Sequence, residues 1–242
     1  MPDNPEVTLA PDGCGTDLQI AEQFGVELAT AQDPSSWQLL RSNGTMVLRA
    51  PRQQGGYEVR VDVSEGPMAR RIRTARRTDP LPRAIGMHRR RVERVVDATA
   101  GLGRDALVLA HLGCTVTAIE RVPALCVLLQ NAVEESEADV EVVRAEATPW
   151  LRERAGSQDA PDVVYLDPMF AENGKAQVKK EMQACRALAG APHDAEELLA
   201  AARAAARERV VVKRHPHHRP LADDVSFEVG GDRVRFDVYL TA

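Results

Sequence analysis

The sequence predicts an α/β protein with two regions: residues 89–242, built on a mainly parallel seven-stranded sheet, and a small α+β region over residues 1–88. Three observations predict this fold class. From residue 94 onward strand-like and helix-like segments alternate, which is typical of a parallel sheet covered on both faces. The last two strand-like segments follow each other directly and indicate a closing antiparallel hairpin. Before residue 88 the alternation is absent.

The N-terminal region combines one helical segment with three short strands. Residues 17–29 are expected to form the helix. The expected strands are WQLLR (37–41), TMVLRA (45–50) and YEVRVDV (57–63). Asp-Pro, Asn-Gly and Gly-Gly pairs, which favour turns, stand before and between these strands. This pattern predicts the small α+β region.

A strongly basic segment joins the two regions. Between Met68 and Arg94 there are ten arginines against Asp79 and Glu93, although the whole chain has a net charge of −5. A basic segment in an acidic protein is typical of a localised contact with a polyanion such as nucleic acid. An arginine-rich solvated linker is the alternative, and both remain open.

The larger region alternates strands and helices. The expected strands are 95–99, 115–120, 140–143, 163–167 and 209–213, followed by the hairpin strands 225–229 and 233–240. The expected helices are 104–112, 123–135, 147–155, 175–189 and 195–208. The second of these helices opens with proline, which suits the first helical turn.

Composition limits the protein class. Apolar residues make up 44% of the chain, enough for a core without covalent staples. Four cysteines (Cys14, Cys114, Cys126 and Cys185) form no CxxC pair, as expected of reduced thiols in a cytoplasmic protein. The first 20 residues lack a basic start followed by an apolar run, and no stretch of about 18 apolar residues exists. We therefore expect a cytoplasmic protein with no membrane contact.

A glycine loop follows the first strand of the larger region. In VVDATAGLGRDA (95–106), Gly101, Gly103 and Ala106 satisfy the alanine variant of the dinucleotide-binding fingerprint. Asp97, at the end of the strand, would face a pyrophosphate unfavourably. A cationic ligand such as S-adenosylmethionine suits that acid better, so the loop predicts a site for this cofactor.

Glu120 ends the second strand, where an acid can accept hydrogen bonds from ribose hydroxyls. Nicotinamide and adenosylmethionine sites both use such an acid, so Glu120 does not separate the two cofactors. A surface ion pair with Arg121 is the alternative reading of this residue.

The sequence VVYLDPMF (163–170) ends a buried strand with a carboxylate and an aromatic ring. Asp167 can accept hydrogen bonds from an exocyclic amino group, and Phe170 offers a face on which an extruded base can stack. A strand end capped by an Asp-Pro turn is the alternative. Beside the glycine loop, the motif predicts base methylation, with Asp167, Pro168 and Phe170 as the catalytic residues.

The histidine-rich stretch KRHPHHRP (213–220) contains three potential metal ligands. Its spacing matches no usual zinc signature, and the neighbouring Lys213, Arg214 and Arg219 would oppose a cation. We expect no metal. Contact with backbone phosphates and a plain surface loop both remain open.

Several motifs together resemble the RsmJ family of class I methyltransferases. They are DATAGLGRDALVLA, ERVPALCVLL, VVYLDPMF, VKKEM, RVVVKR, RFDVY and, in the N-terminal region, GGYEVRVDVSEGPMARR. The resemblance covers most of the chain and implies a Rossmann-like, S-adenosylmethionine-dependent enzyme. Its members methylate the exocyclic N2 of a guanine near the 3′ end of small-subunit ribosomal RNA, so the implied partner is 16S ribosomal RNA or the small ribosomal subunit.

The resemblance also implies the cofactor contacts. They are Arg104, Asp105, Glu120, Arg121, Glu146, Ala147 and Asp167. The chain departs from the family pattern after DPMF, where residues 171–175 read AENGK instead of a proline followed by a basic residue.

Three other functions are compatible with parts of the pattern. Another nucleic-acid amino-methyltransferase, acting on adenine or on DNA, would share nearly all of the chemistry. A nicotinamide oxidoreductase would share the glycine loop but has no evident use for DPMF. A non-catalytic RNA-binding protein would not need Asp97, Glu120 and Asp167.

Overall fold

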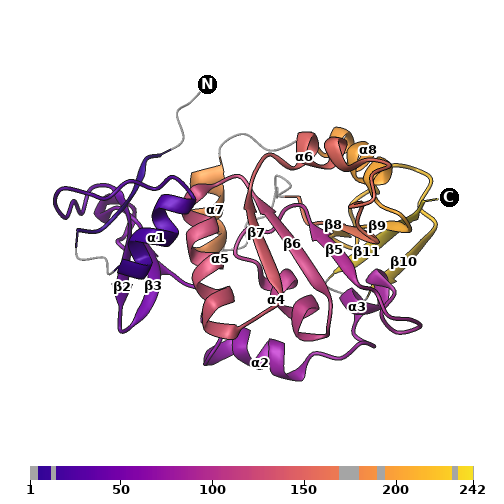
Figure 1. Cartoon of the computed structure of the whole chain (residues 1–242), viewed down its shortest axis with the longest axis horizontal. Helices are drawn as coiled ribbons and strands as arrows, with labels where there is room; N and C mark the ends of the chain where they lie inside the picture. The colour runs from indigo at the N-terminus through magenta and orange to yellow at the C-terminus, as the bar shows by residue number, and fades with distance from the viewer. Residues whose placement is uncertain (1–4, 12–14, 169–179, 190–193, 231–233, 242) are drawn as a thin grey trace.

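The computed structural model describes residues 5–11, 15–168, 180–189, 194–230 and 234–241, which form two β-sheets. Figure 1 shows the smaller sheet at one end of the long axis and the larger sheet toward the other, with two helices between them. The predicted fold class, with a mainly parallel seven-stranded sheet, is confirmed.

The smaller sheet has four strands in the order β1-β2-β3-β4. They are β1 (Val7–Leu9), β2 (Trp37–Ser42), β3 (Thr45–Arg49) and β4 (Glu58–Val59), with helix α1 (Gly15–Gln23) between the first two. The turn between β2 and β3 places Asn43 and Gly44 at positive φ, as a tight Asn-Gly hairpin requires. The sequence patterns did not predict β1, a three-residue strand that is parallel to β2. They predicted longer segments for α1 and β4 than the structure shows.

The larger sheet has the order β10-β11-β9-β8-β5-β6-β7. Its strands are β5 (Arg94–Asp97), β6 (Thr115–Glu120), β7 (Val140–Arg144), β8 (Val163–Leu166), β9 (Arg209–Arg214), β10 (Phe227–Gly230) and β11 (Arg235–Leu240). Strands β5 to β9 are parallel, and β11 is antiparallel to both neighbours. The chain first adds strands on one side of β5 and then, from β8, on the other. Ligands of open parallel sheets bind at the carboxyl ends beside such a reversal.

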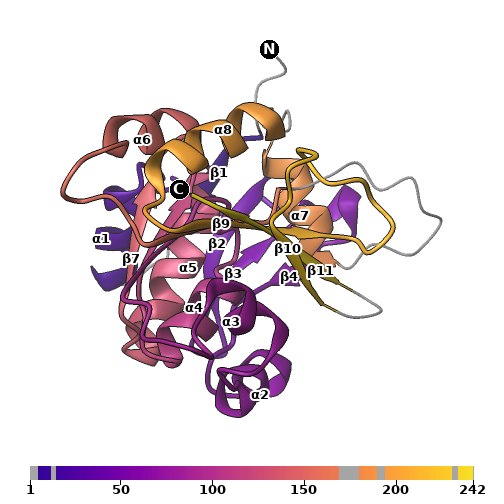
Figure 2. The ribbon, with the colours of Figure 1, turned by 90° about the vertical axis from the view of Figure 1, so that its right-hand side faces the viewer.

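Helices cover both faces of this sheet (Figures 1 and 2). On one face lie α4 (Arg104–His111), α5 (Pro123–Ser136) and α7 (Lys180–Ala189); on the other lie α6 (Ala147–Arg154) and α8 (Ala195–Ala205). Strand β8 shows how the sequence separates the two cores. Val163 and Tyr165 belong to one hydrophobic cluster, whereas Val164 and Leu166 belong to the other, because side chains alternate along a strand.

The arginine-rich segment forms two short helices, α2 (Gly66–Thr74) and α3 (Pro80–Ile85). Helix α2 packs on α4, and α3 packs against β9, β10 and β11. One hydrophobic cluster also runs from Leu9 and Trp37 in the smaller sheet to Val95 in the larger one. The segment is therefore part of the packed structure, and a domain boundary at residue 88 stays a prediction.

Within the part of the chain that the structure describes, every helix is too short or too polar to cross a membrane.

Candidate active site

Charged side chains meet where the parallel strands end. Asp97 ends β5, Glu120 ends β6, Asp167 follows β8, and Lys213 lies near the end of β9. All four line one cavity of about 480 Å³. Sites for small ligands commonly measure about 300–1,000 Å³. The strand ends therefore form a cavity large enough for a cofactor.

The structure brings together most of the residues that the sequence proposed. Those that line the cavity are Asp97, Gly101, Arg104, Asp105, Glu120, Arg121, Asp167 and Pro168. Three others do not line it: Gly103, Glu146 and Ala147. Phe170 lies outside the described residues. The individual roles of all these residues stay predictions.

The glycine loop supports the cavity wall through its backbone. Gly101 and Gly103 both adopt positive φ, +54° and +67°, which glycine tolerates without strain. A side-chain carbon at Gly103 would collide with Leu129 of α5. Gly103 is therefore needed for the close approach of the loop to α5, although it does not face the cavity.

Glu120 is held by the backbone of two loops. Its Oε2 accepts a 2.9 Å hydrogen bond from the N–H of Gly101, and its Oε1 accepts a 2.8 Å bond from the N–H of Val122. Burial raises the pKa of Glu120, and these N–H groups oppose the rise. Each carboxylate oxygen has further lone pairs, so the acid can also accept hydrogen bonds from hydroxyls in the cavity.

Glu146 lies beside Arg121, outside the cavity. The Oε2 atom of Glu146 is 3.8 Å from Nη1 of Arg121. Ala147, at the start of α6, is buried in the hydrophobic cluster on the face of the sheet that α6 and α8 cover. Glu146 thus contacts a cavity residue without lining the cavity.

Asp97 is a buried acid at the centre of the site. Its side chain is almost fully enclosed, and its Oδ1 accepts a 3.2 Å hydrogen bond from the N–H of Thr99. Burial and then repulsion from Asp105 raise the pKa of Asp97 well above its ordinary value. A cation in the cavity would oppose this rise, because an opposite charge favours the ionised form.

Asp105 binds two cations and a hydroxyl. The guanidinium of Arg71, from α2, forms an ion pair with its Oδ1. Lys213 Nζ lies 3.2 Å from Oδ2, and the Tyr165 hydroxyl donates a 2.6 Å hydrogen bond to the same oxygen. Burial alone would raise the pKa of Asp105, but Lys213, Arg71 and Tyr165 outweigh it and lower this pKa to about 2. Asp105 is therefore ionised at neutral pH.

Asp167 shares Lys213 with Asp105. Its Oδ2 lies 2.7 Å from Lys213 Nζ, and its backbone N–H donates a 2.6 Å hydrogen bond to Thr99 Oγ1. Burial raises the pKa of Asp167, Lys213 opposes the rise, and Asp105 adds to it. Its side chain still exposes 41% of its surface. Asp167 is thus a positioned acid that remains accessible from the cavity.

Four residues of this network were not among the predicted site residues: Arg71, Thr99, Tyr165 and Lys213. Ligands bind at the carboxyl ends of parallel strands, and this argument, which predicted Asp167, also applies to Lys213 in RVVVKR. Alternation along β8 places Tyr165 on the same face of the sheet as α4, which carries Asp105. No local signal marks Arg71 among its neighbouring arginines.

The histidine-rich stretch lies on the same cavity. Arg214, His215 and His218 line it, and the rings of the two histidines have centroids 5.2 Å apart. No cluster of His, Cys, Asp and Glu side chains suited to a metal ion occurs among the described residues. Cys185 of α7 also lines the cavity, and burial raises the pKa of its thiol to about 12.

Fold and site define a class of protein: a Rossmann-like enzyme with acids at the strand ends around a glycine loop. A family model described as "Putative SAM-dependent methyltransferase" matches residues 19–241. The crystal structure of an SAM-dependent methyltransferase from Neisseria gonorrhoeae has a TM-score of 0.73 with 30% identity, covering 97% of this chain and 96% of that one. The chain is therefore an S-adenosylmethionine-dependent methyltransferase.

Curated relatives identify the particular family. Ribosomal RNA small subunit methyltransferase J of Pectobacterium atrosepticum is 40% identical over 96% of this chain and 97% of its own length. The protein of the same name from Thioalkalivibrio sulfidiphilus is 42% identical over 81% of each chain. This chain belongs to the ribosomal RNA small subunit methyltransferase J family, and the resemblance seen in its motifs is confirmed.

Proposed function

We propose that this chain transfers the methyl group of S-adenosylmethionine to the exocyclic N2 of a guanine in 16S ribosomal RNA. The observation that carries the proposal is the position of Asp167. This acid follows β8, faces the cavity that Asp97 and Glu120 also line, and is ion-paired with Lys213. The names of the curated relatives support ribosomal RNA of the small subunit as the substrate.

The cavity fits S-adenosylmethionine chemically. Asp97 is buried and acidic, so a cationic group is the complement that it needs. Glu120 lines the cavity and binds the ribose in this proposal, as acids at this position do in related folds. The bound cofactor supplies a methyl group activated by the positive charge on its sulfur.

The residues of the chain then act on the base. The exocyclic nitrogen of guanine is a weak nucleophile, because its lone pair is delocalised into the ring. Asp167 can accept a hydrogen bond from this amino group and orient the lone pair for in-line displacement. Orientation of this kind supplies a large part of the rate in reactions between two bound groups.

A proton must leave the nitrogen as the N–C bond forms and the S–C bond breaks. Asp167 accepts this proton, because its carboxylate is accessible from the cavity, and general-base catalysis contributes about 10²–10⁴-fold where it operates. Lys213 supports this role because its ammonium stabilises the ionised form of Asp167. We place the reaction in the cytoplasm, where the ribosomal RNA is found.

The experiment is methyl transfer from tritium-labelled S-adenosylmethionine to 16S ribosomal RNA and, separately, to small subunits. Digestion to nucleosides should give N2-methylguanosine as the labelled product. An Asp167→Asn variant, assayed at saturating cofactor as established by calorimetry, should transfer methyl groups at least about 100-fold more slowly. Labelled N6-methyladenosine, or label in neither RNA nor subunits, would overturn the proposal.

A further inference from the structure

The arginines between Met68 and Arg94 fall into two groups. One group of six is used by the protein itself: Arg71, Arg90 and Arg91 pair with acids, and Arg73, Arg77 and Arg94 donate side-chain hydrogen bonds to backbone carbonyls. In the other group of four, the guanidinium groups of Arg70, Arg76, Arg83 and Arg89 form no ion pair with an acid among the described residues. The second group is exposed. Exposed cations without partners are available for an external anion.

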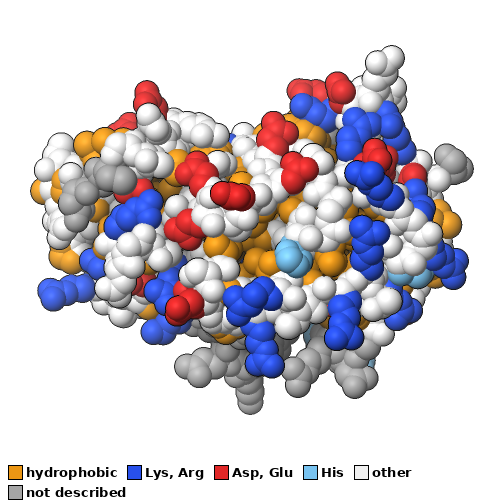
Figure 3. All heavy atoms as spheres, turned by 60° about the horizontal axis from the view of Figure 1, so that its bottom comes forward, with side chains coloured by type: hydrophobic (Ala, Val, Ile, Leu, Met, Phe, Trp, Pro, Cys, Tyr) orange, Lys and Arg blue, Asp and Glu red, His pale blue; other side chains and the backbone are white. Residues whose placement is uncertain are grey.

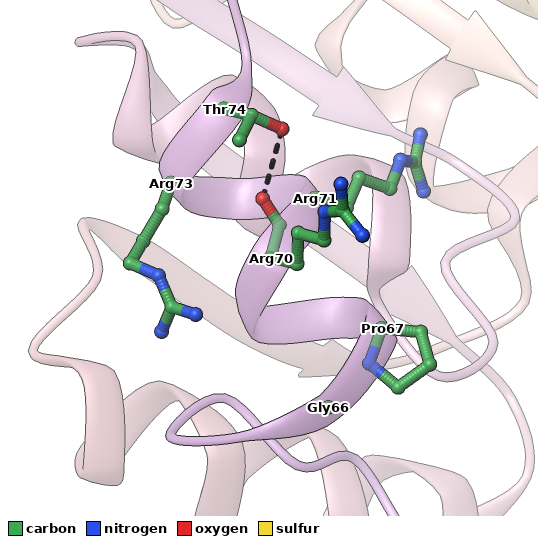
Figure 4. Close-up of a pocket in the computed structure, with 6 residues that line it drawn as sticks. All are labelled: Gly66, Pro67, Arg70, Arg71, Arg73 and Thr74. Atoms are coloured by element: carbon green, nitrogen blue, oxygen red, sulfur yellow. Dashed lines mark hydrogen bonds between the residues drawn. The ribbon is translucent and has the colours of Figure 1, made fainter.

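Helix α2 presents Arg70, from the second group, and the exposed Arg73 beside a hollow in the surface. The hollow is lined by Gly66, Pro67, Arg70, Arg71, Arg73 and Thr74, of which three are arginines and none is acidic. Figure 4 shows Arg70 and Arg71 extending to one side of the helix and Arg73 to the other. Arg73 donates only a 3.3 Å hydrogen bond to the carbonyl of Ser64. The hollow therefore has an excess of positive charge.

Arg71 connects this hollow with the active site. It lines the hollow on α2 and also the 480 Å³ cavity, where it pairs with Asp105. The two sites are thus adjacent and share one side chain. In the space-filling view of Figure 3, which brings the α2 side forward, Lys and Arg side chains gather over the lower and right-hand parts of the face.

We propose that Arg70 and Arg73 on α2 bind the RNA backbone phosphates that flank the target nucleotide, and that Arg71 fixes this helix at the edge of the catalytic cavity. The inference rests on the proposed function, because it takes the occupant of the cavity to be an RNA base. A base in the cavity brings the phosphates of its own strand to the rim. Guanidinium groups bind phosphate oxygens through paired hydrogen bonds, which makes arginine well suited to this rim.

Salt dependence separates phosphate contacts from other effects. Each phosphate neutralised on a single strand contributes about −0.7 to the slope of log affinity against log salt concentration. We therefore expect the double variant Arg70→Ala/Arg73→Ala to bind a 16S ribosomal RNA fragment with a slope flatter by about 1 to 1.5. At 0.1 M salt its RNA affinity should fall on the order of tenfold.

The kinetic outcome should separate docking from chemistry. KM for RNA should rise in the double variant, whereas kcat at saturating RNA and the affinity for S-adenosylmethionine should stay within about twofold. The matched control is Arg52→Ala/Arg152→Ala, which removes the same formal charge at two residues that line neither the hollow nor the cavity. Both control residues are exposed, and Arg152 pairs with Glu197 on the surface of α6 and α8.

Three outcomes would overturn the inference. One is an unchanged salt slope in the α2 variant. Another is an equal loss in the control, which would indicate net charge instead of a localised contact. The third is competition by polyglutamate as strong as by RNA, which would indicate an acidic protein as the partner of α2. Failure of the proposed function would look different, because wild-type protein would then bind RNA without transferring methyl groups to guanine N2.

Discussion

Replacement of Lys213 by methionine tests the network that joins Asp105 to Asp167. The ammonium of Lys213 lies 3.2 Å from the first carboxylate and 2.7 Å from the second. Methionine keeps much of the length of the side chain and removes the charge. Asp105 retains Arg71 and the Tyr165 hydroxyl, whereas Asp167 loses the cation that opposes the rise of its pKa.

The loss of stability can be estimated from these contacts. Breaking a buried ion pair by removing one partner costs about 3–5 kcal/mol when nothing else compensates. Here Arg71 compensates at Asp105, and the Lys213 side chain is 33% exposed, so solvent screening lowers the figure to about 1–3 kcal/mol. For a chain of this size, that loss corresponds to a fall in Tm of roughly 2–12 °C.

The Lys213→Met change should also alter how kcat depends on pH, in a direction that follows from the pKa of Asp167. Asp167 must be ionised to accept a proton, and in wild type its pKa is already raised by burial. Without Lys213, burial and repulsion from Asp105 remain, so this pKa rises further. In a plot of kcat against pH, the rise on the acidic side should therefore move to higher pH. Because the carboxylate also loses the ion pair that orients it, kcat at neutral pH should fall about 10²-fold.

Methyl transfer to 16S ribosomal RNA at pH 5 to 9, with saturating substrates, measures this profile. Lys213→Arg is the matched control, because it keeps the charge. It should retain most of the activity, and the acidic side of its pH profile should coincide with that of wild type. A Lys213→Met enzyme that has wild-type kcat and an unshifted acidic limb would refute the role given to Lys213.

Three further variants test other parts of the structure. Glu120→Gln should weaken S-adenosylmethionine binding about 10-fold by calorimetry, and unchanged affinity would remove Glu120 from the cofactor site. Gly103→Ala should destabilise the protein by about 1–3 kcal/mol in urea unfolding, because the added carbon meets Leu129, and wild-type stability would contradict that collision. Asp17→Ala removes the buried acid that pairs with Arg41, whose side chain is 32% exposed and also donates a hydrogen bond to the Gly44 carbonyl, and should cost about 1–3 kcal/mol; a loss below about 0.5 kcal/mol would show that the pair is not important for stability.

Patterns along the chain were sufficient to predict the larger sheet and the acids at its edge. Strands β5, β6 and β8 are short apolar runs between helices, and Asp97, Glu120 and Asp167 stand where those runs end. In a parallel sheet the carboxyl ends of strands share one edge, so a motif at each end is enough to infer a common site.

Contacts between distant segments could not be predicted in the same way. Arg71 reaches Asp105 across 34 residues of sequence, and nothing in its own segment distinguishes it from Arg70 or Arg73. The contact depends on how α2 packs against α4, which is a property of the tertiary fold. The three-residue strand β1 was missed for a similar reason, since only its pairing with β2 defines it.

The cations near Asp97, Asp105 and Asp167 are distributed unevenly among these three acids. Asp105 is neutralised by Lys213 and Arg71, so its charge adds little to the cavity. Asp97 has no basic residue that forms an ion pair with it among the described residues, and burial already raises its pKa. A cation beside Asp97 would therefore favour ionisation of that acid most strongly, whereas Asp167 remains accessible for the base. We propose that this distribution of cations directs the cofactor toward Asp97 and the nucleophile toward Asp167.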